Sequence, residues 1–385
     1  MNTVSLAISK YMEEPRYSVA NSSTKLLQDG PEVFHKMIEL IDEAQSSIDL
    51  EIYAFMDDRS GFAIQKALLK ALHRGCNVRI IYDSFGSFNT KSSFFEKLKQ
   101  SGAKIMEFHP LWSPGKKMFG FHLRSRNHRK VLIVDDLRCI IGGLNIGDEY
   151  FKPVSAGGIH DLAIYLKGQI ALQALTIFES TWKNTIRIPI LINKAKSTPL
   201  LTENSNQLQI LGSKPIRYRW KIRKTIHHAI KNATKSIDII NPYFVPPSGL
   251  ARALKNAAAR GVKVRILVPK KSDLPLVHLA SYVARNRLLH HGVEFYSWPG
   301  FVHAKAMLID DQWFSVGSYN LDYQSLKWNL EVIVNGYCPN ILSSLKKVMD
   351  EDFGKAEKYT SSTWKKFHFS KRFFADFLYS IRTFL

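Results

Sequence analysis

Short apolar runs alternate along the chain with longer amphipathic stretches, and this alternation predicts strands separated by helices. In the first half, residues 32–44 and 64–74 carry apolar side chains at helical spacing. Residues 48–55 and 77–82 are short runs rich in Ile, Val and Tyr, as is typical of strands. Strands linked by helices of this length favour right-handed crossovers, so we expect a mostly parallel sheet with helices on both faces.

The same order of elements recurs in the second half of the chain. The pattern predicts helices at residues 222–233 and 250–260, and strands at residues 237–240 and 263–268. The underlying segments also align, AQSSIDLEIYAF with ATKSIDIINPYF and RGCNVRI with RGVKVRI. We therefore expect two pseudo-symmetric α/β halves.

The repeat predicts how the chain is divided. We assign residues 27–193 to the first half and residues 207–354 to the second. The polar residues 194–206 form the expected linker, and residues 1–26 form an N-terminal segment. Residues 355–385 form a tail that is rich in basic and aromatic side chains.

A third pair of aligned segments carries polar residues beside its apolar strands. HRKVLIVDDLRCIIGGLN aligns with HAKAMLIDDQWFSVGSYN, and six positions are identical. Those that carry ionisable or amide groups include His128 and His303, Lys130 and Lys305, Asp135 and Asp310, and Asn145 and Asn320. A single HxK pattern carries no information, but its duplication at the same spacing in both halves is a strong signal of a shared site.

Strand geometry indicates where these side chains point. Residues two apart on a strand face the same way, so the His and Lys of each motif point together. We expect both pairs to point into the space between the halves, where the active site would lie. Asp135 and Asp310 have the opposite parity. Within the catalytic motif we interpret them as anchors of the strand end and its loop, not as proton carriers.

Two imidazoles and two ammonium groups in one cleft suit a phosphodiester. One ring can attack phosphorus while the other, protonated, serves the leaving oxygen. The lysines and the amides of Asn145 and Asn320 can neutralise the non-bridging oxygens. Gly143 and Ser318, two positions before these asparagines, are further candidates for substrate contact. Such a site needs no cofactor. The remaining histidines have no repeat partner, show no zinc-site spacing, and are interpreted as surface or packing residues.

Composition narrows the class of partner. The chain has 54 Lys and Arg against 33 Asp and Glu, a formal net charge of +21, which fits nucleic acid, an anionic membrane or a phosphorylated substrate. A hydrophobic content of 45% excludes a disordered chain. Three widely spaced cysteines argue against a disulfide framework. We find no apolar run long enough to span a membrane and no export signal.

The duplicated HxKxxxxD pattern resembles the signature of the phospholipase D superfamily. The chain is also similar to short bacterial cardiolipin synthases of the B type, which lack transmembrane segments, and the likeness includes NPYFVPP and VGSYNLDYQSLKWNLE. The resemblance implies a phospholipase D fold and a phosphatidyltransferase. In that reaction a phosphatidyl group moves to a histidine, and phosphatidylglycerol or another alcohol then takes it up, giving cardiolipin in the first case.

The resemblance also implies individual roles. His128 in the first half would be the nucleophile, and His303 would protonate the leaving group. In the family a downstream carboxylate steadies each histidine, which implies Asp161 for the first half and Glu331 for the second.

The implied partners are anionic phospholipid, phosphatidylglycerol above all, and a membrane surface. Neither nucleic acid nor a stable protein partner is implied. We expect a peripheral protein of the bacterial cytoplasmic membrane. Its expected membrane contacts are the tail, as an interfacial helix, and the loop near Phe119 and Phe121.

Three alternatives stay open at this point. A hydrolytic phospholipase D would use water in place of the second lipid. A nuclease of the same superfamily would use the positive charge and the aromatic residues to hold single-stranded nucleic acid. A basic lipid-binding scaffold would need no chemistry, and the two intact motifs argue against it.

Overall fold

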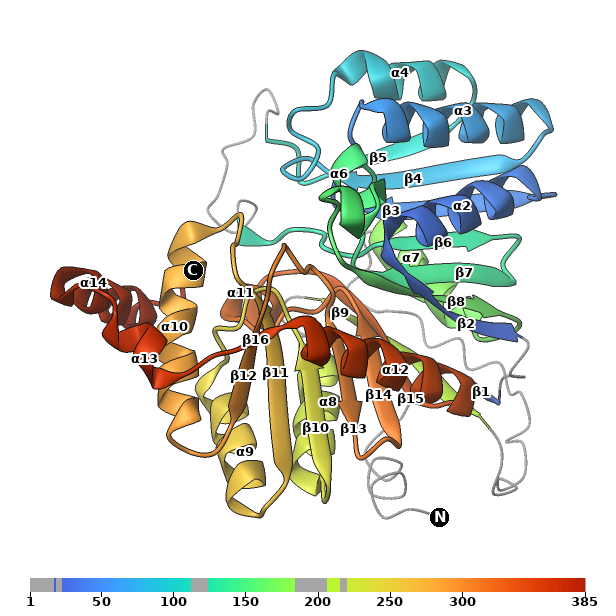
Figure 1. Cartoon of the computed structure of the whole chain (residues 1–385). Coiled ribbons are helices and arrows are strands. Elements are labelled where there is room, and N and C mark those ends of the chain that lie inside the picture. Colours follow the sequence, from blue (N-terminus) through green and yellow to red (C-terminus); the bar gives the residue numbers. More distant parts are fainter. Residues whose placement is uncertain (1–16, 19–22, 112–123, 184–205, 215–219, 385) are drawn as a thin grey trace.

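Two α/β halves lie against one another, each built on one sheet with helices around it (Figure 1). The computed structural model describes residues 17–18, 23–111, 124–183, 206–214 and 220–384. The loop with Phe119 and Phe121 lies outside the described residues, as does the expected linker except for Asn206. The two separate sheets confirm the two-halved architecture expected from the repeat.

Within the described residues, the first half forms a seven-stranded sheet in the order β2-β8-β7-β6-β3-β4-β5. Its strands are β2 (Thr24–Gln28), β3 (Ser47–Ile52), β4 (Asn77–Asp83), β5 (Lys104–Phe108), β6 (Val131–Val134), β7 (Arg138–Gly142) and β8 (Leu162–Lys167). Its helices are α2 (Asp29–Asp42), α3 (Arg59–His73), α4 (Ser92–Gln100), α6 (Asp148–Phe151) and α7 (Ala171–Trp182), with a 3-10 turn η2 (Val154–Ala156).

The second sheet has nine strands among the described residues, in the order β1-β9-β15-β14-β13-β10-β11-β12-β16. They are β1 (Tyr17–Ser18), β9 (Gln207–Ser213), β10 (Ser236–Ile240), β11 (Lys263–Pro269), β12 (Glu294–Trp298), β13 (Ala306–Ile309), β14 (Trp313–Gly317), β15 (Glu331–Tyr337) and β16 (Glu357–Lys358). The helices are α8 (Trp220–Asn232), α9 (Ser248–Ala259), α10 (Pro275–Leu289), α11 (Tyr323–Lys327), α12 (Pro339–Lys355), α13 (Ser361–Lys365) and α14 (Phe369–Ser380). In the described part of the chain, no helix combines the length and apolar character needed to cross a bilayer. All three cysteines are buried and free.

The sheets are mixed, which corrects the expectation of mostly parallel sheets. Parallel pairing is confined to β3, β4 and β5 in one sheet and to β10, β11 and β12 in the other. The motif strands β6 and β13 each return directly as β7 and β14 through three-residue turns at residues 135–137 and 310–312. Such short connections make neighbouring strands antiparallel. The four turn aspartates have positive φ, the conformation that tight hairpin turns require and that Asp tolerates.

The sequences of the motif strands, VLIV and AMLI, are entirely apolar because both faces of each strand are buried. On β6, Leu132 and Val134 pack in the core of the first half. Val131 and Ile133 point the other way, into an apolar cluster that also contains Phe314 of β14 in the second half. Burial of this shared cluster stabilises the contact between the two sheets.

His160, two residues before β8, ties the halves together. Its Nδ1 is 2.5 Å from Asp29 Oδ1 at the start of α2, and its Nε2 is 2.8 Å from Asp352 Oδ2 on α12 of the second half. The ring stacks on Trp298 and is 1% exposed. Of the two interpretations left open for the remaining histidines, surface or packing, His160 therefore takes the second, and its two acidic partners could not be read from the sequence.

The ion pairs of His160 predict a pH-dependent stability. Burial opposes the charged ring, but hydrogen bonds to Asp29 and Asp352 outweigh it and raise the pKa of His160 to about 10. Because the folded pKa exceeds the unfolded one, the stabilisation is complete below the unfolded value of about 6.5 and is lost as pH rises through about 10.

We expect His160→Asn to lower the free energy of unfolding by about 3 kcal/mol at pH 6, because it leaves the buried carboxylate of Asp352 and the partly exposed one of Asp29 without their cation. The difference from wild type should shrink steadily between pH 7 and pH 10. Urea denaturation across this range measures it. A difference that is constant with pH would mean that the ring is neutral in the folded protein.

Candidate active site

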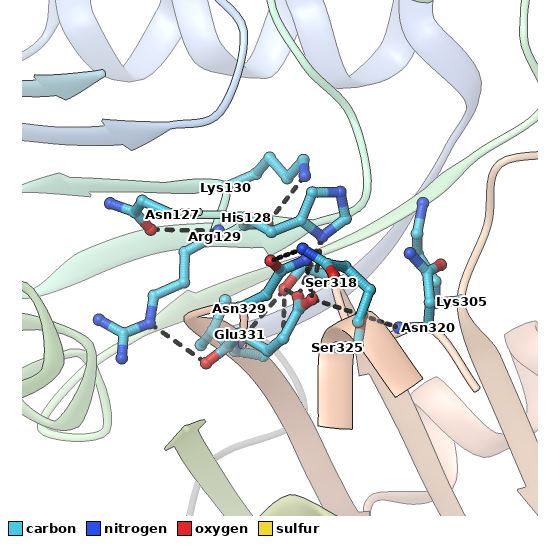
Figure 2. Close-up of polar contacts among 12 residues, drawn as sticks. Asn127, His128, Arg129, Lys130, Lys305, Ser318, Asn320, Ser325, Asn329 and Glu331 are labelled. Carbon is cyan, nitrogen blue, oxygen red and sulfur yellow. Dashed lines mark hydrogen bonds and ion pairs between the residues drawn. The ribbon is translucent and has the colours of Figure 1, made fainter. Parts of the chain in front are cut away.

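Both HxK pairs lie directly before their motif strands, at the seam between the halves. His128 and Lys130 precede β6, and His303 and Lys305 precede β13. All four side chains are buried. Figure 2 shows the His128 ring pointing toward Lys305 and Asn320 of the other half. The structure thus brings the two motifs together at one place, as their duplication predicts.

Backbone hydrogen bonds across the seam place the motifs. The His128 N–H donates to the carbonyl of Leu330 (2.9 Å), the residue before β15. The His303 N–H donates to the carbonyl of His160 (2.8 Å), just before β8. Each motif is therefore positioned by the beginning of a strand in the opposite half.

Each motif histidine also contacts a carboxylate of the opposite half. His128 Nδ1 lies 3.1 Å from both carboxylate oxygens of Glu331, and His303 Nδ1 lies 2.8 Å from Asp161 Oδ2 (Figure 2 shows the first contact). The expected pairing of each carboxylate with the histidine of its own half is therefore wrong. Asp161 and Glu331 stand where β8 and β15 begin, which is where the opposite motif is bound by its backbone.

The two carboxylates are held in different ways. Glu331 accepts hydrogen bonds from Ser318 Oγ and, at 2.7 Å, from Ser325 Oγ. The first-half counterpart of Ser318 is Gly143, where a Cβ would lie 2.3 Å from Asp161 Oδ1. The second half thus combines the longer glutamate side chain with a serine, and the first half combines the shorter aspartate side chain with a glycine. The structure places Ser318 and Gly143 beside these carboxylates.

Burial favours the neutral form of both imidazoles. It lowers the pKa of His128 to about 4, although Glu331 opposes the shift. Burial and the charge of Lys305 lower the pKa of His303 to about 3. Since each Nδ1 faces a carboxylate, Nδ1 carries the ring proton and Nε2 has the free lone pair. This tautomer is the one required of a nucleophile or a general base.

The two lysines provide a positively charged site. Lys130 Nζ donates to the carbonyl of His128 (2.8 Å), and Lys305 Nζ donates to that of His303. Burial, and then the charge of Lys305, lower the pKa of Lys130. Burial lowers the pKa of Lys305 to about 8. Two buried cations that repel one another favour binding of an anion, which would offset both the burial of the ammonium groups and the repulsion between them.

Asp135 and Asp310 hold the chain where β3 and β10 begin. The Asp135 carboxylate accepts from the three backbone N–H groups of residues 45–47, at 2.8–3.2 Å. Asp310 accepts from those of residues 234–236, at 2.7–2.9 Å. These bonds overcome the effect of burial and lower the pKa of Asp135 to about 2. This is the anchoring arrangement that strand parity predicts.

The two motif asparagines differ in their surroundings. Asn145 accepts from the Ala54 N–H (3.3 Å) and donates to the Tyr150 hydroxyl (2.8 Å). Asn320 Oδ1 is buried and has no hydrogen-bond partner among the described residues. A ligand group is therefore better placed to engage the amide of Asn320 than that of Asn145.

Three tyrosines near the histidines were not predicted. The Tyr53 ring centroid is 5.2 Å from that of His128, and the rings of Tyr150 and Tyr243 are 5.6 and 6.4 Å from that of His303. For Tyr53 and Tyr243 the available signal was the aromatic ending of the aligned segments EIYAF and NPYF, at the ends of β3 and β10, whereas Tyr150 lies outside both segments. Within the described residues, no group of three or more His, Cys, Asp or Glu side chains is arranged to hold a metal ion.

Comparisons with known proteins agree with this geometry. A family model described as "Cardiolipin synthase, PLD-like domain" matches residues 37–182 and 226–353. A probable cardiolipin synthase of Bacillus subtilis is 33% identical over 88% of this chain and 67% of its own length. Cardiolipin synthase 1 of Staphylococcus aureus is 31% identical over 94% of this chain and 73% of its own length.

Among solved structures, the phosphatidylserine synthase of Haemophilus influenzae superposes over the whole of both chains with a TM-score of 0.77. Its sequence identity is 13%, so this likeness concerns the fold alone. The family match, by contrast, covers both halves and both motifs. The chain therefore belongs to the phospholipase D-like family of cardiolipin synthases.

Proposed function

We propose that this protein is a cardiolipin synthase-like phosphatidyltransferase that works through a phosphohistidine intermediate. The observation that carries the proposal is the meeting of two crossed His–carboxylate pairs with two buried lysines at the seam. The names of the relatives support phospholipid as the substrate class. We take phosphatidylglycerol as both donor and acceptor.

The first step forms a bond between His128 Nε2 and phosphorus. Glu331 accepts a hydrogen bond from the Nδ1–H of that ring, which keeps its proton, and the carboxylate stabilises the imidazolium that develops. The bond between phosphorus and the oxygen of the headgroup glycerol breaks. His303 supplies the proton that this departing oxygen takes up. Lys130, Lys305 and the Asn320 amide bind the non-bridging oxygens as charge accumulates.

The second step reverses the proton transfers. His303, now neutral, accepts the proton from a hydroxyl of a second phosphatidylglycerol, whose oxygen attacks phosphorus. The bond from phosphorus to His128 breaks, which releases cardiolipin and regenerates the enzyme. The net reaction consumes two phosphatidylglycerol molecules and yields cardiolipin and glycerol, so no further co-reactant is needed.

The protonation of His303 is coupled to substrate binding. Without ligand its pKa is lowered to about 3 by burial and by Lys305, so the ring is neutral near pH 7. A phosphodiester anion bound beside it adds the opposite charge and raises that pKa. His128, whose pKa is about 4, is already neutral, as a nucleophile must be.

Burial of the site favours transfer over hydrolysis. His128 is 8% exposed and His303 is 4% exposed, so little water reaches the reacting atoms. The substrates are lipids, and we therefore place the protein on the surface of the cytoplasmic membrane of a bacterium.

Product analysis tests the reaction type. We expect vesicles of phosphatidylglycerol, incubated with the protein in the presence of a chelator, to yield cardiolipin and glycerol in equal amounts. Thin-layer chromatography and mass spectrometry measure both. Phosphatidic acid in place of cardiolipin would mean a hydrolase, and cleavage of single-stranded DNA with intact lipid would mean a nuclease.

Adduct mapping tests the roles of the two histidines. A phosphatidyl ester of p-nitrophenol needs no general acid, since its leaving group is stable as an anion. With this donor, we expect His303→Asn to release one equivalent of nitrophenolate and to accumulate the phosphoryl adduct on His128, because no base remains for the second step.

With phosphatidylglycerol as donor, the same variant should lose about 10²–10⁴-fold in turnover, the usual contribution of a general acid. His128→Asn should form no adduct with either donor. Peptide mapping under alkaline conditions, which preserve phosphohistidine, locates the label. An adduct on His303 in the His128→Asn variant would reverse the two roles.

A further inference from the structure

Helix α14 leaves a row of phenylalanines exposed at the edge of the second half. Its buried residues Ala375, Leu378 and Tyr379 belong to the same core cluster as the buried side of α10, with α14 lying outermost in Figure 1. Phe369 and Phe373, one turn apart, are 72% and 69% exposed. Phe374 and Phe377 add two further rings, 44% and 51% exposed. Soluble surfaces rarely carry such a patch without a partner.

A basic cavity opens beside this helix. It has a volume of about 240 Å³ and lies between α9, α10 and α14. Its cationic lining consists of Arg252, Lys255 and Arg287, and His291 and the Tyr379 ring of α14 form part of the wall. The lining contains no acidic residue among those described, although Asp376 lies 3.6 Å from the Arg287 guanidinium. An anionic group is the ligand that this lining fits.

The chain after α14 runs back to the loops that flank the active site. Arg382 donates to the Ser248 hydroxyl (3.2 Å) at the start of α9. The same guanidinium lies 5.8 Å from the ring centroid of Tyr323, three residues after Asn320. Phe384, 69% exposed, lies 5.4 Å from the Arg124 guanidinium, ahead of the first motif. The end of the chain therefore connects α14 to the segments next to both motifs.

We propose that α14 and the basic cavity form a surface that docks on an anionic lipid bilayer. The phenylalanines enter the boundary between headgroups and acyl chains, and the cavity holds the phosphate of an anionic headgroup. Further positive charge comes from Lys365 and Lys366, just before α14, and from Lys371 and Arg372 on α14. An apolar face flanked by cations is the composition of helices that lie in the membrane interface.

This surface deepens the proposed function, because it presents the site to the membrane that contains the donor and acceptor lipids. The charge argument favours a bilayer over a protein partner. The net charge of +21 attracts any anionic surface, and a membrane accepts large aromatic side chains without a matching pocket.

The first experiment measures sedimentation of the full chain with vesicles of 30% phosphatidylglycerol in phosphatidylcholine. We expect Phe373→Ser to weaken partitioning by about fivefold, as loss of one interfacial aromatic side chain does, and Phe369→Ser/Phe373→Ser/Phe377→Ser to abolish it. Leu137→Ser is the matched control, because Leu137 is 51% exposed at the far end of β6. Unchanged partitioning of the triple variant would overturn the proposal.

The second experiment tests the cavity. Arg252→Gln/Lys255→Gln should remove the preference for phosphatidylglycerol vesicles over vesicles of phosphatidylcholine alone. Lys66→Gln/Lys70→Gln on α3 removes the same charge from the other half and should keep that preference. Equal losses in both double variants would mean that net charge alone, without the cavity, attracts the membrane.

Activity on detergent-dispersed short-chain phosphatidylglycerol separates this proposal from the proposed function. The α14 variants should keep that activity and lose activity on vesicles. If wild type binds vesicles through α14 but forms no cardiolipin, the docking surface stands and the proposed function fails. If a single-stranded oligonucleotide binds wild type, displaces it from vesicles and fails to bind the same variants, the surface serves nucleic acid and the docking proposal is overturned.

Discussion

The contact between each motif histidine and a carboxylate of the opposite half is the constraint on which the site depends. Neither half contains a complete pair, since His128 needs Glu331 and His303 needs Asp161. The seam must therefore be packed before the tautomers of the two rings are defined. The apolar cluster between the sheets and the His160 link serve that requirement, and stability and chemistry are coupled through the same interface.

The site is built from groups that are unfavourable when buried without a ligand. Burial lowers the pKa values of both lysines and both histidines, and the charge of nearby lysines lowers those of His128, Lys130 and His303 further. The fold maintains this arrangement because the surrounding backbone is tightly held. Between His128 and Lys130, for example, Arg129 points the opposite way and donates to the Ser213 carbonyl (2.7 Å) on β9. A phosphodiester anion relieves the repulsion, so binding and pre-organisation have the same electrostatic origin.

Much of the fold followed from local patterns. The predicted helices and strands around β3, α3 and β4, and their second-half counterparts, lie within a few residues of the observed ones. The direction of the strands was predicted wrongly, because helical spacing suggested crossovers throughout while the paired aspartates in fact form hairpin turns. Those turns could have been recognised from two adjacent aspartates between apolar runs.

The sequence by itself determined the repeat, the two HxK pairs, the parity that sets Asp135 and Asp310 apart from them, and membership of a phosphodiester-processing family. The repeat, the motifs and their parity follow from the order of residues along the chain, and the family follows from the resemblance of those motifs to a known signature. Only the tertiary structure decided which carboxylate supports which histidine, that His160 is buried between two acids, and that the phenylalanines of α14 face outward. Each of these depends on the packing of segments more than 100 residues apart or on which side of a helix is covered, and no local pattern encodes that.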